Sequence, residues 1–208
     1  MAKTNRIGAG KYRAVTGIDG IAEKRLHHSR IKSYLGIKVA YPMRWYTYKF
    51  LTRSVNQDDL RHFQRFFASV PEPIRSSFAR VLSVKKEGKE WVLQQKLIQD
   101  FDGTVSRSLA EKAGRVSSPF FWKRFEEVLD FLVRNRIPLL DLQPQNVLVK
   151  RLSADKAIPV LFDYKRMSGR YYPAQPWLWF KRGQKSRVVR GAKAIRQKFA
   201  SPAEQSDA

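Results

Sequence analysis

Apolar residues recur at helical spacing in two parts of the chain, and each part predicts a helix. Asp58-Asp59 is expected to cap the first helix, which should end before Pro71-Glu72-Pro73 because proline cannot continue a helix. Its apolar positions are Leu60, Phe63, Phe66 and Phe67. The second helix begins at Ser117-Ser118-Pro119, where a polar cap precedes proline, and Asn135 is its expected stop. Both apolar stripes are expected to lie in a core.

Pairs of short apolar runs predict β-hairpins. The first hairpin occupies residues 14–26 around Asp19-Gly20, a pair of residues that favours a type I′ turn. A second hairpin lies between residues 78 and 98 around Glu87-Gly88, and residues 99–103 form a connecting segment after it.

A third pair of strands is predicted after the second helix. The apolar runs Val147–Val149 and Val160–Phe162 are separated by a polar turn at residues 153–156. Residues 27–56 are basic and aromatic without a clean period, so the pattern assigns no element to them.

The composition adds a strong positive charge and removes cysteine chemistry. The 208 residues carry 41 Lys and Arg against 18 Asp and Glu, and the net charge of +23 attracts nucleotides, nucleic acids or anionic lipids. Without cysteine, disulfides, a thiolate nucleophile and Cys-ligated zinc are excluded. No apolar run approaches the roughly 20 residues of a membrane-spanning helix. Since no signal-peptide apolar region follows the polar residues 1–6, a soluble, cytoplasmic protein is expected.

The strongest candidate for chemistry is a polar set around the third pair of strands. Asn146 follows Asp141 by five residues, and Asp163 stands at the end of the pair. Phosphoryl transfer from ATP requires one carboxylate to orient or deprotonate the acceptor hydroxyl, while an amide oxygen and a second carboxylate hold Mg²⁺. The set therefore predicts ATP and Mg²⁺ as cofactors. A purely turn-forming role is the alternative, since Asp, Pro and Asn are common turn residues.

Two glycines near the N-terminus stand where backbone can approach phosphates. Gly8 and Gly10 precede a strand, and Lys24 lies on the returning strand, sixteen residues after Gly8. A lysine at that position could reach the α- and β-phosphates. Lys38 is a rival for this role because it also lies in an apolar, strand-like context.

With these motifs, the sequence resembles the protein-kinase-like superfamily. Within it, the sequence is similar to the small bacterial YrbL-like family, which is linked to the PhoP regulatory network. The most specific segments are 98–103, 141–148 and 158–163, and the resemblance spans roughly residues 7–164. It implies that Asp141 is the catalytic aspartate and that Asn146 and Asp163 are the metal ligands.

The resemblance also assigns the nucleotide-binding residues. It makes Lys24 the lysine that contacts ATP, and Gly8 and Gly10 the glycine loop. Residues 97–103 would be the hinge that takes the adenine.

Several positions depart from the kinase pattern. The histidine and arginine expected before the catalytic aspartate are Leu139 and Leu140, and the usual lysine two residues after it is Gln143. The glycine expected after the metal-binding aspartate is missing, because that segment is Asp163-Tyr164-Lys165. Arg13 stands where a third glycine is usual.

Two further departures concern the helix after Lys24 and the end of the chain. The helix offers Asp58 and Asp59 at its start but no mid-helix Glu to pair with the lysine. About 45 residues follow Asp163, which we expect to be too few for the helical subdomain that cradles peptide substrates. A small or envelope-associated acceptor, such as a sugar or a lipid-linked glycan, is therefore favoured over a peptide.

The C-terminal region combines aromatic residues with positive charge. Residues 177–180 read Trp-Leu-Trp-Phe, and residues 181–198 carry eight basic side chains and no acid. This pattern is typical of a membrane-surface anchor, and a solvated terminus is the alternative. Nucleic acid is a less favoured partner because no helix-turn-helix, zinc finger or RNP motif is present. The sequence gives no signal for an oligomeric state.

These observations and the resemblance predict a minimal bilobal protein-kinase-like fold of the α+β class. A sheet-rich N-lobe is expected at residues 1–98, a truncated helical C-lobe at 99–180 and a basic tail at 181–208, with ATP and Mg²⁺ between the lobes. The predicted function is phosphoryl transfer to an alcohol group of a small or envelope-associated acceptor. The alternative is a catalytically weak pseudokinase that binds nucleotide and docks on a membrane or a partner. In both cases a cytoplasmic location, peripheral on the inner membrane, is expected.

Overall fold

The computed structural model describes most of the chain after residue 54 and parts of the N-terminal region. The described residues are 5–9, 13–18, 20–26, 55–88, 90–112, 114–164, 167 and 175–201. Gly10 and Lys38 lie outside them, so their predicted roles stay predictions. The chain divides into a first unit, Met1–Arg65 with Arg80–Leu97, and a second unit, Phe66–Ala79 with Ile98–Ala208.

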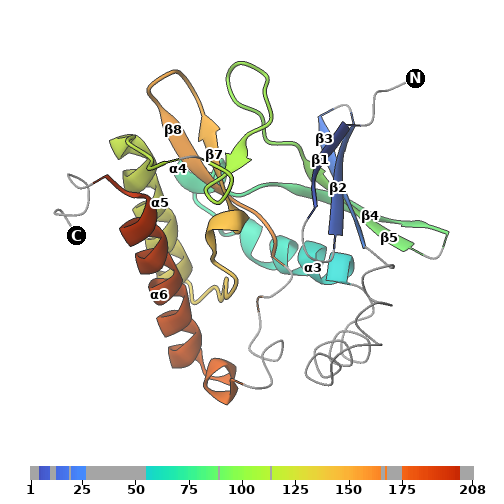
Figure 1. The fold of residues 1–208 in the computed structure, drawn as a ribbon. Coiled ribbons are helices and arrows are strands. Elements are labelled where there is room, and N and C mark those ends of the chain that lie inside the picture. The colour runs from blue at the N-terminus through green and yellow to red at the C-terminus, as the bar shows by residue number, and fades with distance from the viewer. Residues whose placement is uncertain are drawn as a thin grey trace, which may run out of the picture. The chain divides into compact units, whose positions relative to one another are not determined.

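The first unit contains a five-stranded antiparallel sheet, drawn from blue to green in Figure 1. The strand order is β1-β2-β3-β5-β4. The strands are β1 (Asn5–Ala9), β2 (Arg13–Ile18), β3 (Ile21–Leu26), β4 (Val81–Glu87) and β5 (Glu90–Lys96). The first two predicted hairpins are confirmed as β2–β3 and β4–β5. Gly20 and Gly88 occupy their turns with φ of +76° and +58°, a region that favours glycine.

Helix α3 (Val55–Phe67) follows the predicted stripe but begins earlier than predicted. The prediction that Asp58-Asp59 caps this helix was wrong, because both residues lie inside its first turns. The side chain of Asn56 explains the earlier start. Its Nδ2 donates to the carbonyl oxygens of Lys24 and Trp91, at 2.9 and 2.6 Å, and so fastens the beginning of the helix to β3 and β5.

The second unit combines a small antiparallel sheet with helices. Its sheet order is β6-β7-β8. The strands are β6 (Arg107–Ser108), β7 (Val147–Arg151) and β8 (Ala157–Leu161). The helices are α4 (Glu72–Arg75), α5 (Pro119–Arg134) and α6 (Lys181–Phe199), and the 3₁₀ turns are η1 (Pro144–Asn146) and η3 (Pro176–Trp179). The predicted third pair of strands is confirmed as the β7–β8 hairpin.

Helix α5 forms the core of the second unit together with β8. The helix contacts β8, all five residues of β8 are buried, and α6 lies beside α5 (Figure 1). The predicted start and stop of α5 are confirmed, with Ser118 as the N-cap and Asn135 as the C-cap. Ser118 makes no side-chain capping hydrogen bond. Of the predicted start signal, Pro119 in the first turn is therefore the residue that favours the helix start. The buried residues of α5 are Phe121, Trp122, Phe125, Val128, Phe131 and Leu132.

The basic C-terminal segment is a helix with one buried face. Val188, Ala192, Ile195 and Phe199 of α6 are buried in the second unit, so residues 181–199 are part of a packed unit rather than a solvated terminus. None of the described helices is both long enough and apolar enough to cross a membrane.

Replacement of Asn56 by alanine is expected to destabilise the first unit. The change leaves two carbonyl oxygens without their side-chain donor at a site where Asn56 is fully buried, and the expected loss is about 1–3 kcal/mol in the free energy of unfolding. Urea unfolding followed by circular dichroism measures it. Gln64→Ala, at an exposed position of the same helix, is the control. Equal unfolding midpoints for the two variants would contradict the anchoring role.

Candidate active site

A short loop before β7 carries Asp141 and Asn146. The loop is closed by two hydrogen bonds of Asn146. Its backbone N–H donates to Gln143 O, and its side-chain Nδ2 donates to Asp141 O, both at 2.8 Å. Asn146 is buried, whereas Asp141 is half-buried. The five-residue spacing noted in the sequence therefore reflects a side chain that holds the backbone of Asp141.

Asp163 lies at the other end of the same hairpin. Val147 of β7 pairs with Leu161 of β8, and the N–H of Phe162 donates to Asn146 O at 3.2 Å. The structure therefore brings Asp141, Asn146 and Asp163 into one region of the second unit. Asp163 is buried and has a φ of +74°, a left-handed conformation that is uncommon for a residue other than glycine. Such strain is frequent at functional sites.

Tyr164 anchors the segment that follows β8, a role that the sequence did not predict. Its side chain is fully buried, and its hydroxyl donates to the carbonyl oxygens of Ala79 and Leu161, at 3.0 and 2.8 Å. Phe66 packs edge-on against its ring, with centroids 5.3 Å apart. Tyr164 thereby fixes the backbone directly after Asp163. The sequence signal that could have indicated this role is an aromatic residue that closely follows an apolar strand.

Helix α6 supports the loop that holds Asp141. Leu139 and Leu140, which replace the expected histidine and arginine, are buried. The Nε of Arg187 donates to Leu140 O at 3.0 Å. A Cβ on Gly191 would lie only 2.8 Å from Leu142 O, so the helix backbone approaches the loop closely there. Sequence reasoning missed both α6 residues, although a glycine inside a helical pattern is a sign of close packing.

Asn146 and Asp163 offer oxygen ligands that fit Mg²⁺. Because Nδ2 of Asn146 is committed to Asp141 O, its Oδ1 is the side-chain atom that can bind a cation. Asp163 contributes a carboxylate. Within the described ranges no cluster of three or more His, Cys, Asp or Glu side chains could form a metal cage. Mg²⁺ needs no such cage, since it usually keeps waters and binds few protein groups together with substrate phosphates.

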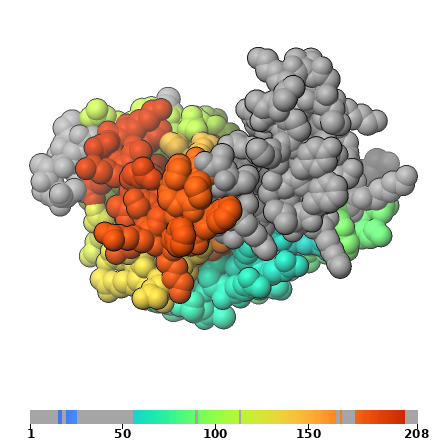
Figure 2. Space-filling view, turned by 90° about the horizontal axis from the view of Figure 1, so that it is seen from below, coloured from blue at the N-terminus to red at the C-terminus, as the bar shows by residue number. Residues whose placement is uncertain are grey.

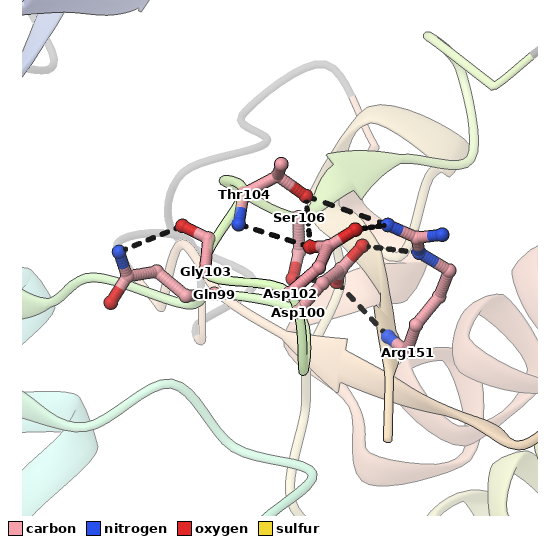
Figure 3. Close-up of polar contacts among 7 residues, drawn as sticks. All are labelled: Gln99, Asp100, Asp102, Gly103, Thr104, Ser106 and Arg151. Atoms are coloured by element: carbon pink, nitrogen blue, oxygen red, sulfur yellow. Dashed lines mark hydrogen bonds and ion pairs between the residues drawn. The ribbon is translucent and has the colours of Figure 1, made fainter. Parts of the chain in front are cut away.

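The segment after β5 is locked by a network of carboxylates around Arg151 (Figure 3). Asp100 accepts hydrogen bonds from the backbone N–H and Nε of Arg151, at 3.0 and 2.7 Å, and from the hydroxyl of Ser106. Asp102 accepts from the backbone N–H and hydroxyl of Thr104, at 3.1 and 2.6 Å, and also from Arg151. The Thr104 hydroxyl contributes most to lowering the pKa of Asp102 below its usual value, and the ion pairs, with Asp100 first, raise the pKa of Arg151.

This network bears on the predicted adenine hinge at residues 97–103. The two units divide between Leu97 and Ile98. The N–H of Leu97 donates to Gly20 O at 2.8 Å, and the carbonyl of Ile98 accepts from the N–H of Ser106 at 3.0 Å. Residues 99–106 fold back as a turn tied to β7, with a bridge between Gln99 and Val105. Adenine binding by this segment stays a prediction.

The predicted phosphate-binding residues of the first unit lie on its sheet. Lys24 is buried on β3 and pairs in register with Val15 of β2 and Leu93 of β5. Gly8 lies within β1, opposite Val15 and directly after an irregularity in the register. The described structure therefore places Gly8 in a strand. Its predicted role in a phosphate loop stays a prediction.

Two carboxylates of α3 are buried in the same unit as Lys24. Asp58 is 4% exposed and Asp59 is fully buried. Asp59 lies three residues after Asn56, so the two share one face of the helix. Because Asn56 bonds the Lys24 carbonyl, that face is the one directed at β3.

Comparisons with known proteins identify the fold. No family model and no curated protein matches the sequence. The crystal structure of the Rio2 kinase from Chaetomium thermophilum is similar, with a TM-score of 0.60 at 11% identity, over 96% of this chain and 59% of that one. The Rio2 kinase–ADP/Mg²⁺–phosphoaspartate complex from the same organism matches with a TM-score of 0.56 at 12% identity, over 96% and 57% of the two chains.

The chain has a protein-kinase-like fold. This confirms the predicted α+β class, with a sheet-rich N-terminal part and helices in the C-terminal part. The chain spans less than three fifths of the length of these two kinases. The narrower resemblance to the YrbL-like family stays a prediction.

Removal of the Tyr164 hydroxyl is expected to destabilise the second unit. Tyr164→Phe keeps the ring but removes the one hydroxyl that lies within hydrogen-bond distance of Ala79 O and Leu161 O. Leu161 O retains the N–H of Ala79 as a donor, so the expected cost is about 1–3 kcal/mol in the free energy of unfolding, for one lost buried hydrogen bond. Chemical denaturation gives this value. The matched control is Ser77→Ala, because the Ser77 hydroxyl is buried without a hydrogen-bond partner among the described residues, and its removal should be neutral or stabilising. A neutral Tyr164→Phe variant would rule out the anchoring role.

Proposed function

We propose that this protein is an ATP- and Mg²⁺-dependent phosphotransferase that acts on an alcohol group. The observation that carries the proposal is the hydrogen bond from Asn146 Nδ2 to Asp141 O. It joins the proposed catalytic carboxylate to a proposed metal ligand, and the hairpin register adds Asp163 as the second ligand. The similarity to a kinase solved with ADP and Mg²⁺ supports this choice of cofactors.

Each residue of this set has a separate role. Asp141 is the only member of the set that is half-exposed, which suits a group that orients or deprotonates an acceptor hydroxyl. Oδ1 of Asn146 and the carboxylate of Asp163 would hold Mg²⁺, which neutralises charge on the phosphates when bound. Arg187 would keep the loop of Asp141 in place, and Tyr164 would do the same for the segment of Asp163.

In the first unit, Lys24 would contact the α- and β-phosphates, and the backbone at Gly8, in β1, and at Gly10 would approach them. We infer that Asp59 is the acidic partner of Lys24. Both groups are buried, charged side chains are rarely buried unless they are paired, and Asp59 shares the helix face that is fastened to β3. An aspartate in the first turns would thus replace the missing mid-helix Glu.

For the acceptor, we propose a small or envelope-associated molecule such as a sugar or a lipid-linked glycan. The net charge of +23 favours an anionic acceptor. The proposed link to the PhoP network rests on the YrbL-like resemblance. The proposed location is the cytoplasm, peripheral on the inner membrane.

One observation favours a second function, that of a nucleotide-binding pseudokinase. Buried Leu139 and Leu140 replace the polar pair before Asp141, so this part of the loop is held by packing and by Arg187. Such a loop could bind nucleotide with little turnover and serve as a regulatory or membrane-docking module.

Mg²⁺-ATP is expected to raise the melting temperature of the protein. A ligand that binds only the folded state at 100 times its Kd adds about 2.7 kcal/mol, or roughly 5–10 °C for a chain of this size. Asp163→Ala should abolish the rise, because it removes a proposed Mg²⁺ ligand. Asp155→Ala, which removes an exposed carboxylate in the turn of the same hairpin, should retain it.

Turnover then separates the enzyme from the pseudokinase. Asp141→Asn should keep the thermal shift but lower ATP turnover on the order of 100-fold, because general-base catalysis contributes at least that much. A shift without turnover across a panel of hydroxyl acceptors would identify a pseudokinase. If Mg²⁺-ATP gives no shift, both functions are excluded.

The proposed Lys24–Asp59 pair is expected to appear as energetic coupling in nucleotide binding. Lys24→Met and Asp59→Asn should each weaken ATP binding roughly tenfold, and the double variant should be little weaker than either, because each change alone already removes the pair. Isothermal titration of the four proteins measures the coupling. Asp58→Asn is the control, since Asp58 is also buried but pairs with Arg61. If the losses in ATP affinity from Lys24→Met and Asp59→Asn add up in the double variant, the proposed pair is contradicted.

A further inference from the structure

One face of the second unit exposes three aromatic side chains at the start of a basic helix. Trp177 and Trp179 of η3 are 51% and 59% exposed, and Phe180 is 69% exposed. Figure 2 shows the η3 turn (orange) and α6 (red) on the same face of the molecule. Scattered single apolar residues on a surface need no explanation, but three large rings within four residues do.

The aromatic turn is built into the unit. Leu178, between the two tryptophans, is fully buried, and its carbonyl accepts a hydrogen bond from Gln184 Nε2 at 2.8 Å. A Cβ on Gly183 would overlap with Trp177 O, so α6 and η3 are in direct backbone contact. The three rings are thus presented to solvent by a segment that is anchored on α6.

The outer face of α6 continues this surface with cations. The half of the helix away from the buried stripe exposes Arg182, Val189, Arg190 and Lys193, at spacings of seven, eight and eleven residues from the first, together with the uncharged Ser186 and Gln197. None of these three cations forms an ion pair with a described residue, whereas Arg196, nearer the buried stripe, pairs with Glu126. The outer face therefore has positive charge that is not neutralised by this part of the chain.

We propose that η3 and the outer face of α6 form a docking surface for the anionic lipid headgroups of a membrane. Tryptophan and phenylalanine side chains enter the boundary between headgroups and acyl chains, and lysine and arginine bind the headgroup phosphates. Each cation near an anionic membrane adds attraction that depends on salt.

The arrangement of the apolar residues favours a membrane over a nucleic acid. Proteins that bind single strands place aromatic rings along a basic groove, so that successive bases stack on them. Here the rings gather at one end of the helix. Val189, which has no ring to stack on a base, is exposed between Arg182 and Arg190 on the basic face. Insertion into lipid accounts for all four apolar side chains.

The docking surface shares a helix with the candidate active site. Arg187 and Gly191 contact the loop around Asp141 from the same helix that bears the exposed cations. The surface itself does not depend on the proposed function. A further consequence, that the acceptor is presented at the membrane, rests on the proposed function.

Vesicle co-sedimentation of the full chain tests the proposal. Vesicles of phosphatidylcholine alone are compared with vesicles that contain one part phosphatidylglycerol in three. Binding is expected only to the anionic vesicles and should weaken with salt. Trp fluorescence should be quenched by brominated acyl chains, and Trp177→Phe/Trp179→Phe should remove that quenching.

Two sets of variants separate the cations from the rings. Arg182→Gln/Arg190→Gln/Lys193→Gln should lower partitioning on the order of 100-fold, at about fivefold for each charge. Lys85→Gln/Lys86→Gln/Lys112→Gln is the control, with the same loss of net charge on other elements. Trp179→Ser/Phe180→Ser should remove the binding that persists at high salt. Phe101→Ser, at a ring that is 55% exposed elsewhere, should not.

Three results would overturn the proposal: equal binding to neutral vesicles, equal effects of the cation variants and their control, or tight RNA binding without vesicle binding. The last result would mark the surface as a nucleic-acid site. All substituted side chains are exposed or half-buried, and unchanged melting temperatures would verify that the variants fold. Because the Mg²⁺-ATP thermal shift is measured without vesicles, failure of the docking surface and failure of the proposed function are distinguishable.

Discussion

The geometry of the candidate site depends on one residue, Asn146. Its side-chain amide donates to the backbone of Asp141, and its backbone carbonyl oxygen accepts from the N–H of Phe162, directly before Asp163. One buried residue thus links the loop of Asp141 directly to the segment of Asp163. Without it, only the strands of the β7–β8 hairpin would connect the two. The side chain of an aspartate at position 146 would have no N–H to donate to Asp141 O, which gives a physical reason for an asparagine there.

The sequence predicted those parts of the fold that are encoded locally. Helical periodicity located α5, and turn residues located the hairpins, because these signals lie within the elements themselves. The start of α3 was missed because it depends on bonds from Asn56 to carbonyls 32 and 35 residues away. The Asp141–Asn146–Asp163 set was recognisable because its spacing in the chain is the spacing of the hairpin. Tyr164 and Arg187 contribute through contacts with distant backbone, for which a single sequence has no local signal.

Helix α6 shows how charge can hide structure in a sequence. Its eight basic residues suggested a surface segment, yet Val188, Ala192, Ile195 and Phe199 recur at helical spacing and are buried. The two faces have different tasks. The inner face packs on the second unit and supports the loop of Asp141, and the outer face carries cations. The same helix is therefore part of the core and part of the surface.

The two glycines of α6 make the helix dependent on its surroundings. Each glycine lowers intrinsic helix stability by about 1 kcal/mol relative to alanine. At positions 183 and 191 no larger residue fits against the backbone of Trp177 and Leu142 without displacing it. A synthetic peptide of this segment would therefore be mostly unfolded in water, and its helix forms in step with the unit on which it packs. Local unfolding of the helix would remove its contacts with the loop of Asp141, so the order of that loop depends on the order of α6.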